Sequence, residues 1–143
     1  MTTPIIEHRF RVALHDTDAA GVLFFAHLFR HAHDAYEAMM VRIGWPLDGL
    51  IRGRQIGLPL VHVEADFRHP MRHGDQVAVK IERAGLTERD FSLAYGFFIH
   101  EFEVATALSV HAAIDPRFGK RQRLSPELAH ALTALPPCAE PGV

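Results

Sequence analysis

The sequence predicts an α+β fold in which an antiparallel sheet packs on one long helix. A strand-like segment, residues 5–14, precedes a helical segment that runs from about Val22 to Ile43 without Gly or Pro. Four more strand-like segments follow. Apolar side chains cover so much of the helix surface that a sheet must pack against it. The remaining sheet edges and the uncovered face predict that a second subunit also packs there.

The long helix is predicted from apolar side chains that recur every three or four residues. Gly44 marks its end, because glycine accepts the left-handed cap conformation. Trp45 and Pro46 follow, and proline cannot continue a helix. The apolar positions that carry this prediction are Phe25, Leu28, Phe29, Ala32, Ala35, Tyr36, Met39, Met40 and Ile43.

Turn signals separate the four later strands. Gly, Pro and Asp lie in residues 70–75 and 86–90, whereas 101–103 would make a short turn without glycine. Four consecutive strands of this kind predict an antiparallel meander packed on the helix. The strands are expected at 60–69, 76–84, 91–101 and 104–114, and short helices at 47–53 and from Ser125-Pro126 to Leu135.

Length and composition limit the class of protein. A chain of 143 residues fits one domain, expected over residues 1–137 with a frayed tail at 138–143. A hydrophobic fraction of 48% is typical of soluble proteins, and a net charge of -2 favours neither nucleic acid nor an anionic membrane as a partner. Charged residues near the N-terminus argue against a signal peptide, and the single cysteine, Cys138, excludes a disulfide framework. We therefore expect a cytoplasmic protein.

Two acidic residues, Asp16 and Asp18, lie in a loop of small residues immediately before the long helix. Unpaired N–H groups at a helix N-terminus bind anions, and they can stabilise the oxygen charge that develops during acyl transfer. A carboxylate beside such a site suggests hydrolysis. The alternative is that either residue is only a helix cap or a loop residue.

The segment Asp16-Thr17-Asp18-Ala19-Ala20-Gly21-Val22 resembles the D-x-D-x-x-G-V segment of the 4-hydroxybenzoyl-CoA thioesterase family of hot-dog proteins. The resemblance covers about residues 10–115. Within the family, residues 33–37 and 58–62 are most similar to the 1,4-dihydroxy-2-naphthoyl-CoA thioesterases. The resemblance implies a hot-dog fold, that is, a five-stranded antiparallel sheet wrapped around one long central helix. It also implies a homodimer with active sites at the interface, and a homotetramer of two such dimers.

The same resemblance implies hydrolysis of an aromatic acyl-CoA, of the 1,4-dihydroxy-2-naphthoyl-CoA or 4-hydroxybenzoyl-CoA type, to the free acid and CoA. Asp18 would be the catalytic carboxylate, as nucleophile or as base for water, and Asp16 would support the loop. The backbone N–H that polarises the carbonyl maps to Phe25, where relatives often carry Tyr. Gly21 and Val22 are candidate substrate-binding residues. No cofactor is expected, because CoA is part of the substrate and a thiolate leaves readily at neutral pH.

His62 and Arg89 are two further candidates for substrate binding. His62 is expected near the start of a strand, either as a satisfied core histidine or as the partner of an aryl hydroxyl at the bottom of an apolar pocket. Arg89 and the basic run 117–123 could pair with the CoA phosphates, with a solvated loop as the alternative for the run. The aromatic residues are expected mostly in the core, with a few lining an aryl pocket.

Other interpretations of these residues compete with hydrolysis. His27, His31 and Asp34 have a helical spacing that could place three metal ligands on one face, but the Glu of an H-E-x-x-H motif is missing, so no metal is predicted. A non-catalytic hot-dog protein that holds an acyl group on CoA or a carrier protein is the main alternative function, and a requirement for Asp18 in turnover distinguishes the two. A hot-dog dehydratase is less favoured, because no His stands in a matching motif.

Overall fold

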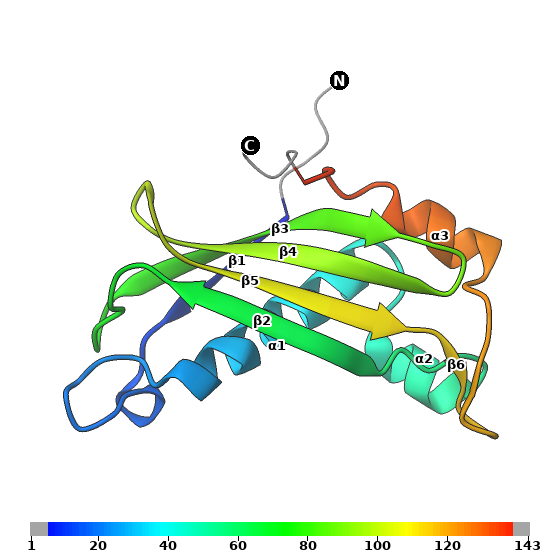
Figure 1. The fold of residues 1–143 in the computed structure, drawn as a ribbon, viewed down its shortest axis with the longest axis horizontal. Coiled ribbons are helices and arrows are strands. Elements are labelled where there is room, and N and C mark those ends of the chain that lie inside the picture. The colour runs from blue at the N-terminus through cyan, green and yellow to red at the C-terminus, as the bar shows by residue number, and fades with distance from the viewer. Residues whose placement is uncertain (1–5, 139–143) are drawn as a thin grey trace.

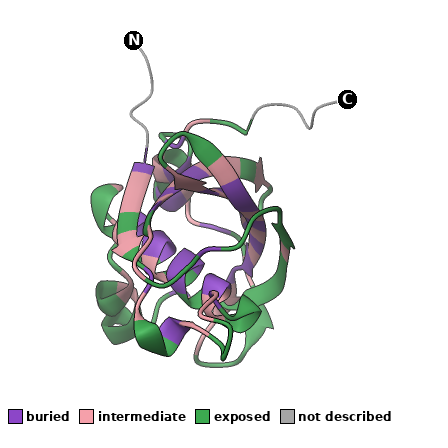
Figure 2. Ribbon diagram, turned by 90° about the vertical axis from the view of Figure 1, so that its left-hand side faces the viewer, coloured by how far each residue is buried: buried purple, intermediate pink, exposed green. Residues whose placement is uncertain are grey.

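The computed structural model describes residues 6–138 and shows a five-stranded antiparallel sheet curved around one long helix (Figure 1). In the view of Figure 2 the buried residues lie between the helix and the inner face of the sheet. The predicted α+β class and central helix are therefore confirmed. The elements are β1 (Ile6–Arg11), a 3-10 helix (Leu14–Asp16), α1 (Phe25–Arg42), α2 (Leu47–Gly53), β2 (Leu60–Phe67), β3 (Gln76–Leu86), β4 (Asp90–Ile99), β5 (Phe102–Ala112), β6 (Ile114–Asp115), β7 (Lys120–Arg121) and α3 (Pro126–Leu132).

Helix α1 begins three residues later than the sequence pattern predicts. Thr17 forms an antiparallel bridge with Leu23, and the Asp18 N–H donates to the Val22 carbonyl at 2.9 Å, so the segment before Phe25 is a small hairpin. The helix ends as predicted, before Gly44, whose φ is 90°. Its buried side consists of Leu28, His31, Ala32, Ala35, Tyr36, Met39 and Met40.

The predicted meander is wrong for β2. The strand order is β1-β3-β4-β5-β2, so β3, β4 and β5 form consecutive pairs while β2 pairs with β5 at the far edge. The amides of Arg68 and His69 both donate to the Val104 carbonyl, at 2.9 and 3.1 Å, which keeps the chain beside β5 until residues 70–75 cross to β3. A crossing of this length is not a tight hairpin. As a result, β2 is an edge strand, and seven of its eight residues are exposed.

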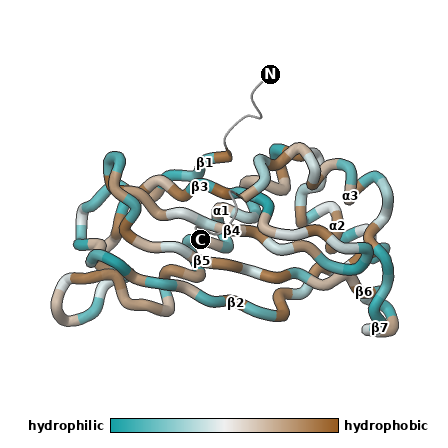
Figure 3. Tube along the Cα trace, turned by 45° about the horizontal axis from the view of Figure 1, so that its top comes forward, coloured by the Kyte–Doolittle hydropathy of each residue, from teal (hydrophilic) through white to brown (hydrophobic). Residues whose placement is uncertain are grey.

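The strands alternate between buried and less buried positions, as a sheet with one covered face requires. In β4 the inward positions Phe91, Leu93, Tyr95 and Phe97 are all buried. Figure 3 shows the same alternation of hydropathy along the strands, with mostly hydrophilic turns. One cluster of buried apolar side chains runs from β1 through α1 and the sheet to α3. No helix within residues 6–138 is long and apolar enough to cross a membrane.

The C-terminal segment packs back on the sheet through α3. Ser125 caps this helix, because its Oγ accepts from the Leu128 amide at 3.2 Å, and Leu128 is fully buried. The predicted helix start is confirmed. Beyond α3, the Cys138 amide donates to the Arg83 carbonyl at 2.8 Å, so the first residue of the predicted tail is attached to β3. Residues 139–143 of that tail lie outside the described residues.

Candidate active site

Asp16 anchors the loop between β1 and α1 from inside the protein. Its carboxyl group is 1% exposed, and Oδ2 accepts from the Ala13 amide at 2.9 Å. Oδ1 lies 2.5 Å from Arg30 Nη2 and 3.1 Å from His31 Nε2, both on α1. The Asp16 carbonyl accepts from the Phe24 amide at 2.9 Å. This side chain therefore connects both ends of the loop to the first turns of α1.

The surroundings of Asp16 stabilise its charged form. Burial alone would raise the pKa of Asp16, but the Ala13 amide, Arg30 and His31 outweigh this effect and hold the pKa below its usual value. Burial lowers the pKa of His31, against the opposing influence of Asp16, so the imidazole is neutral near pH 7, and its Nε2 lies close to both the Asp16 carboxylate and Arg30 Nη2. With its oxygens engaged in this way, Asp16 fits a supporting role better than a chemical one.

Asp18, in contrast, is exposed at the tip of the small hairpin. Its Oδ1 accepts from the Ala20 amide at 2.8 Å and, more weakly, from the Val22 amide at 3.4 Å. The Gly21 amide donates to the Asp18 carbonyl at 3.0 Å, and Gly21 has the positive φ of 77° that this turn requires. Oδ2 accepts no hydrogen bond from residues 6–138. One carboxylate oxygen is thus held by the loop, and the other is available to a substrate or water.

The first turn of α1 offers free N–H groups just beyond this hairpin. Phe24 occupies the cap position without a side-chain hydrogen bond, and the first turn contains no acidic residue. Among the described residues, nothing accepts from the amides of Phe25 and Ala26, and the Phe25 side chain is 61% exposed. The positive end of the helix dipole is therefore unoccupied, as an oxyanion site needs.

Gly21 and Val22, two of the predicted substrate-binding residues, belong to the same hairpin. Val22 bridges to Arg72, and the Gly21 carbonyl accepts from the His73 amide at 3.1 Å, so the hairpin is fastened to the segment between β2 and β3. A cavity of about 280 Å³ opens beside it, lined by Val22, Leu23, Phe67, Arg68, His69, Pro70 and Met71. The hairpin and the helix start thus bring together Asp18, Gly21, Val22 and the Phe25 amide.

His62 and Arg89 do not join this cluster within one chain. The His62 side chain is 56% exposed on β2 and lies 3.2 Å from Glu64, so the core-histidine interpretation is wrong. Arg89 belongs to the β3–β4 turn, where its carbonyl accepts from the Ala113 amide at 2.9 Å. That turn and the loop before α1 lie at opposite ends of the sheet (Figure 1). Substrate-binding roles for both residues stay predictions.

The sequence predicted an apolar aryl pocket but not its position, and the structure shows a groove between α1 and β2. We call it the α1–β2 groove; its volume is about 480 Å³, and most of its lining is apolar. The buried hydroxyls of Tyr95 and Ser109 interrupt this apolar surface. The available signal was the presence of Ser109 and His111 among the otherwise apolar inward positions of β5. The lining residues are Phe29, Arg30, Ala32, His33, Leu58, Pro59, Leu60, Val63, Tyr95, Ala107, Leu108 and Ser109.

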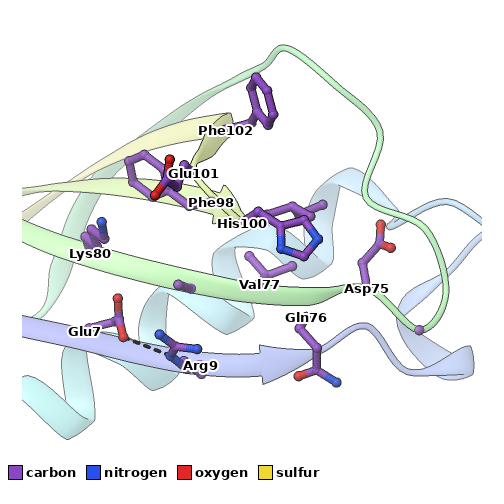
Figure 4. A pocket seen from close by; sticks show the side chains of 13 residues that line it. Glu7, Arg9, Asp75, Gln76, Val77, Lys80, Phe98, His100, Glu101 and Phe102 are labelled. Carbon is purple, nitrogen blue, oxygen red and sulfur yellow. Dashed lines mark hydrogen bonds and ion pairs between the residues drawn. The ribbon is translucent and has the colours of Figure 1, made fainter.

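A third cavity, of about 800 Å³, lies beside β1, β3 and the β4–β5 turn (Figure 4). Acidic and basic side chains alternate around it, and Arg9 pairs with Glu7 at 2.9 Å. No residue of the Asp18 hairpin lines this cavity. Three of its lining side chains are acidic and two are basic, so its charge and its position fit an anionic acyl-CoA less well than the hairpin and the groove do.

Comparison with known proteins places this geometry in a family. Residues 12–132 match the family model described as the thioesterase-like superfamily. The chain belongs to this superfamily. A 1,4-dihydroxy-2-naphthoyl-CoA hydrolase from Microcystis aeruginosa is 34% identical over 132 residues, which cover 92% of this chain and 96% of that protein. A protein of the same name from Picosynechococcus is 37% identical over 125 residues, covering 83% and 86% of the two chains.

Solved structures agree with the sequence matches. Slr0204, a 1,4-dihydroxy-2-naphthoyl-CoA thioesterase from Synechocystis, superimposes on this thioesterase with a TM-score of 0.84 at 27% identity, over 91% of this chain and 96% of the other. The gentisyl-coenzyme A thioesterase BH1999 shares the fold with a TM-score of 0.80 at 23% identity, over 89% and 98% of the two chains. The predicted hot-dog thioesterase, and with it a thioester hydrolase, is confirmed.

Proposed function

We propose that this thioesterase hydrolyses an aromatic acyl-CoA to the free acid and CoA, with Asp18 as the catalytic carboxylate and the Phe25 N–H bound to the thioester carbonyl oxygen. The observation that carries the proposal is the exposed Asp18, which has one free carboxylate oxygen in a hairpin immediately before the unoccupied N-terminus of α1. The names of the relatives favour 1,4-dihydroxy-2-naphthoyl-CoA as the substrate, with 4-hydroxybenzoyl-CoA as the alternative.

Two routes are consistent with this arrangement. In the first, Asp18 attacks the thioester carbon, the C–S bond breaks, CoA leaves as a thiolate, and water then hydrolyses the resulting anhydride. In the second, Asp18 takes a proton from water as the water attacks, and the C–S bond breaks in the same way. In both, the Phe25 N–H would stabilise the charge on the carbonyl oxygen, and removing such a donor typically costs about 10²–10³ in rate. Because a thiolate with a pKa near about 8.5 needs little help to leave, neither route needs a bound cofactor.

Thiol release from a panel of aryl and aliphatic CoA thioesters tests the proposal. Asp18→Asn should lower kcat by about 10²-fold or more with little change in KM. Asp48→Asn is the matched control, because Asp48 is an exposed acid on α2 that pairs with Arg52. Equal activity of the two variants would rule out Asp18 as the catalytic carboxylate. Retained binding without turnover by the wild type would favour the non-catalytic acyl-binding protein.

We also propose that the working unit is a homodimer and that the protein is cytoplasmic; the exposed edge of β2 supports the dimer. β2 pairs with β5 on one side only, and its apolar residues Leu60, Val61, Val63 and Phe67 are 43%, 58%, 37% and 47% exposed. An unpaired edge that carries apolar side chains is suited to pair with the same edge of a second copy. A tetramer of two such dimers remains the prediction from the family resemblance.

Sedimentation equilibrium tests the dimer. Val61→Lys places a charge on the edge strand and should shift the protein toward monomers. Ile51→Lys is the control, because Ile51 is 74% exposed on α2 and does not belong to β2, so this variant should sediment as the wild type does. A monomeric wild type, or a Val61→Lys variant that associates normally, would contradict pairing through β2.

A further inference from the structure

Three buried polar side chains form a hydrogen-bonded chain at the floor of the α1–β2 groove. Tyr95 Oη lies 2.7 Å from Ser109 Oγ, and Ser109 Oγ lies 2.9 Å from His111 Nε2. The three residues are 3%, 5% and 0% exposed. Tyr95 and Ser109 line the groove, and His111 lies behind them. Tyr95 and Ser109 are therefore the residues with polar side chains that β4 and β5 contribute to the groove.

The direction of the chain follows from the protonation of His111. Burial and the nearby His33 lower the pKa of His111 to about 4, so the ring is neutral at pH 7 and carries a single N–H. Nε2 contacts Ser109, and Nδ1 makes no hydrogen bond of good geometry within residues 6–138. The Leu58 carbonyl acts to raise the pKa of the ring, which is the effect of an acceptor that faces an N–H. We assign the single proton of the ring to Nδ1, because Nε2 contacts Ser109 and a lone pair on Nδ1 would lie on the side of the Leu58 carbonyl.

With the proton on Nδ1, every other proton of the chain is assigned. Nε2 must accept, so Ser109 donates its only proton to His111 and accepts from Tyr95. Tyr95 has then donated its only proton. Both hydroxyls present nothing but lone pairs to the groove, so a carbonyl, ether or carboxylate oxygen would meet repulsion there, while an O–H group would find an acceptor.

We propose that Tyr95 and Ser109, oriented by His111, form an acceptor site that recognises a hydroxyl group on the aromatic ring of the acyl substrate. The proposal rests on the proposed function and adds the residues that distinguish a hydroxylated ring from an unsubstituted one. The position is suitable, because Phe29 in the groove follows Phe25 by one helical turn, about 6 Å along the axis. A thioester held at the Phe25 amide can direct its ring along α1 into the groove.

A third buried hydroxyl, that of Tyr36, also fits a polar group of the substrate in this region. Tyr36 is 1% exposed, and its ring stacks on His111 with centroids 4.3 Å apart. Its Oη has no hydrogen-bond partner in the described part of the chain. Burial raises the pKa of Tyr36, and Tyr95 adds to this effect. The hydroxyl group on the substrate's ring would donate its proton to Tyr95. Its own lone pairs could then accept a hydrogen bond from the unpaired Tyr36 O–H.

Matched thioesters that differ only in the ring substituent test the acceptor site. We expect wild-type kcat/KM to be at least about 10-fold higher for 4-hydroxybenzoyl-CoA than for benzoyl-CoA or 4-methoxybenzoyl-CoA, because the methoxy group cannot donate. Tyr95→Phe should lower kcat/KM about 10-fold or more for the hydroxylated substrate and less than about 3-fold for benzoyl-CoA. The 1,4-dihydroxy-2-naphthoyl and 2-naphthoyl thioesters form a second pair. Equal losses on both members of a pair would overturn the proposal.

The Ser109→Ala variant distinguishes the proposed proton arrangement from a merely structural role of Ser109, because the two predict different substrate preferences. Without Ser109 as its acceptor, the Tyr95 O–H is free to donate into the groove, so the preference for 4-hydroxy over 4-methoxy rings should fall about 10-fold or more. Ser92→Ala is the control, because Ser92 lies on β4 at an outward position, and its preference should match the wild type. An unchanged preference in a folded Ser109→Ala variant would overturn the proton assignment.

Binding of non-hydrolysable CoA thioethers separates this proposal from the proposed function. If the wild type cleaves no aryl thioester but binds the hydroxylated thioether at least about 10-fold more tightly, and Tyr95→Phe abolishes the difference, hydrolysis fails and the acceptor site stands. If the wild type cleaves aryl thioesters without any preference for a ring hydroxyl in either turnover or binding, the acceptor site fails and hydrolysis stands.

Discussion

His31 lies between Asp16 and Phe10, with its Nε2 3.1 Å from the Asp16 carboxylate and its ring stacked on the Phe10 ring at a centroid distance of 3.6 Å. One imidazole thus connects the loop before α1 to β1. The loop carries the candidate catalytic residue, yet the groups that fix it are buried beneath it. The buried side chains that fix the shape of the loop are therefore different from the side chain that we propose for the chemistry.

Asp16→Asn should lower the free energy of unfolding without directly removing a reacting group. The change leaves His31 and Arg30 without the charge that they surround, and the expected loss is about 2 kcal/mol, at the low end for a buried pair because the Arg30 side chain is 47% exposed. Urea denaturation measures it. Asp34→Asn, which removes a half-exposed partner of the same arginine at 3.7 Å, should cost less than about 0.5 kcal/mol. Similar losses in both variants would contradict this account.

Gly21→Ala should affect turnover as well as stability. Gly21 has a φ of 77° and open space around its missing Cβ, so the cost is conformational, about 1 kcal/mol. Gly119 has a φ of 70° and equally open surroundings, but it lies after β6, outside the Asp18 hairpin. Thermal unfolding should show similar losses in both alanine variants, whereas thiol release should fall only in Gly21→Ala. Loss of activity in Gly119→Ala would show that the effect is not local.

Stability should fall as the pH is lowered from about 6.5 toward 4. Burial and His33 lower the pKa of His111 to about 4, so native His111 stays neutral while the unfolded state takes up a proton. The contribution of neutral His111 to stability is complete above the unfolded pKa of about 6.5. Protonation of the unfolded state lowers the free energy of unfolding by about 3 kcal/mol by pH 4. The lowered pKa of His31 acts in the same direction. Urea midpoints across this range should therefore change less in His111→Gln than in the wild type.

Ser125→Ala should destabilise the packing of α3 on the sheet. The change removes the Oγ acceptor of the Leu128 amide and should cost about 1 kcal/mol in the free energy of unfolding. Ser125→Asp keeps an acceptor at the cap and adds a favourable charge at the helix N-terminus, so denaturation should leave it close to the wild type. A loss of equal size in Ser125→Asp would mean that the cap bond is not the cause.

Periodic patterns in the sequence predicted the elements well where local contacts decide them. The bounds of α2 and the start of α3 match, and the strands differ by only a few residues. The start of α1 was predicted too early because the hairpin bonds of Asp18 and Val22 oppose the helical pattern. The β4–β5 turn forms without glycine, because His100 itself adopts the left-handed φ of 56° that glycine would usually supply.

The position of β2 and much of the candidate site depend on distant contacts, which periodicity does not encode. Nothing in residues 60–67 indicates that they pair with β5 instead of β3, and His62 is exposed for the same reason. The family resemblance indicated Asp18 and the Phe25 amide, and the structure places both in one loop and helix start, while their catalytic roles stay predictions. Tyr95, Ser109 and His111 come together only because β4 and β5 pair in one register.

Leu60 and Val63 line the α1–β2 groove and also belong to the exposed apolar edge of β2. Any substitution that reshapes the groove at these positions therefore changes the strand edge as well. Evolution cannot adjust the two surfaces independently there, so a change of acyl group by this route must remain compatible with whatever pairs with β2. Positions on α1 such as Phe29 and His33 carry no such double constraint from the edge, and they are the ones at which specificity can diverge first.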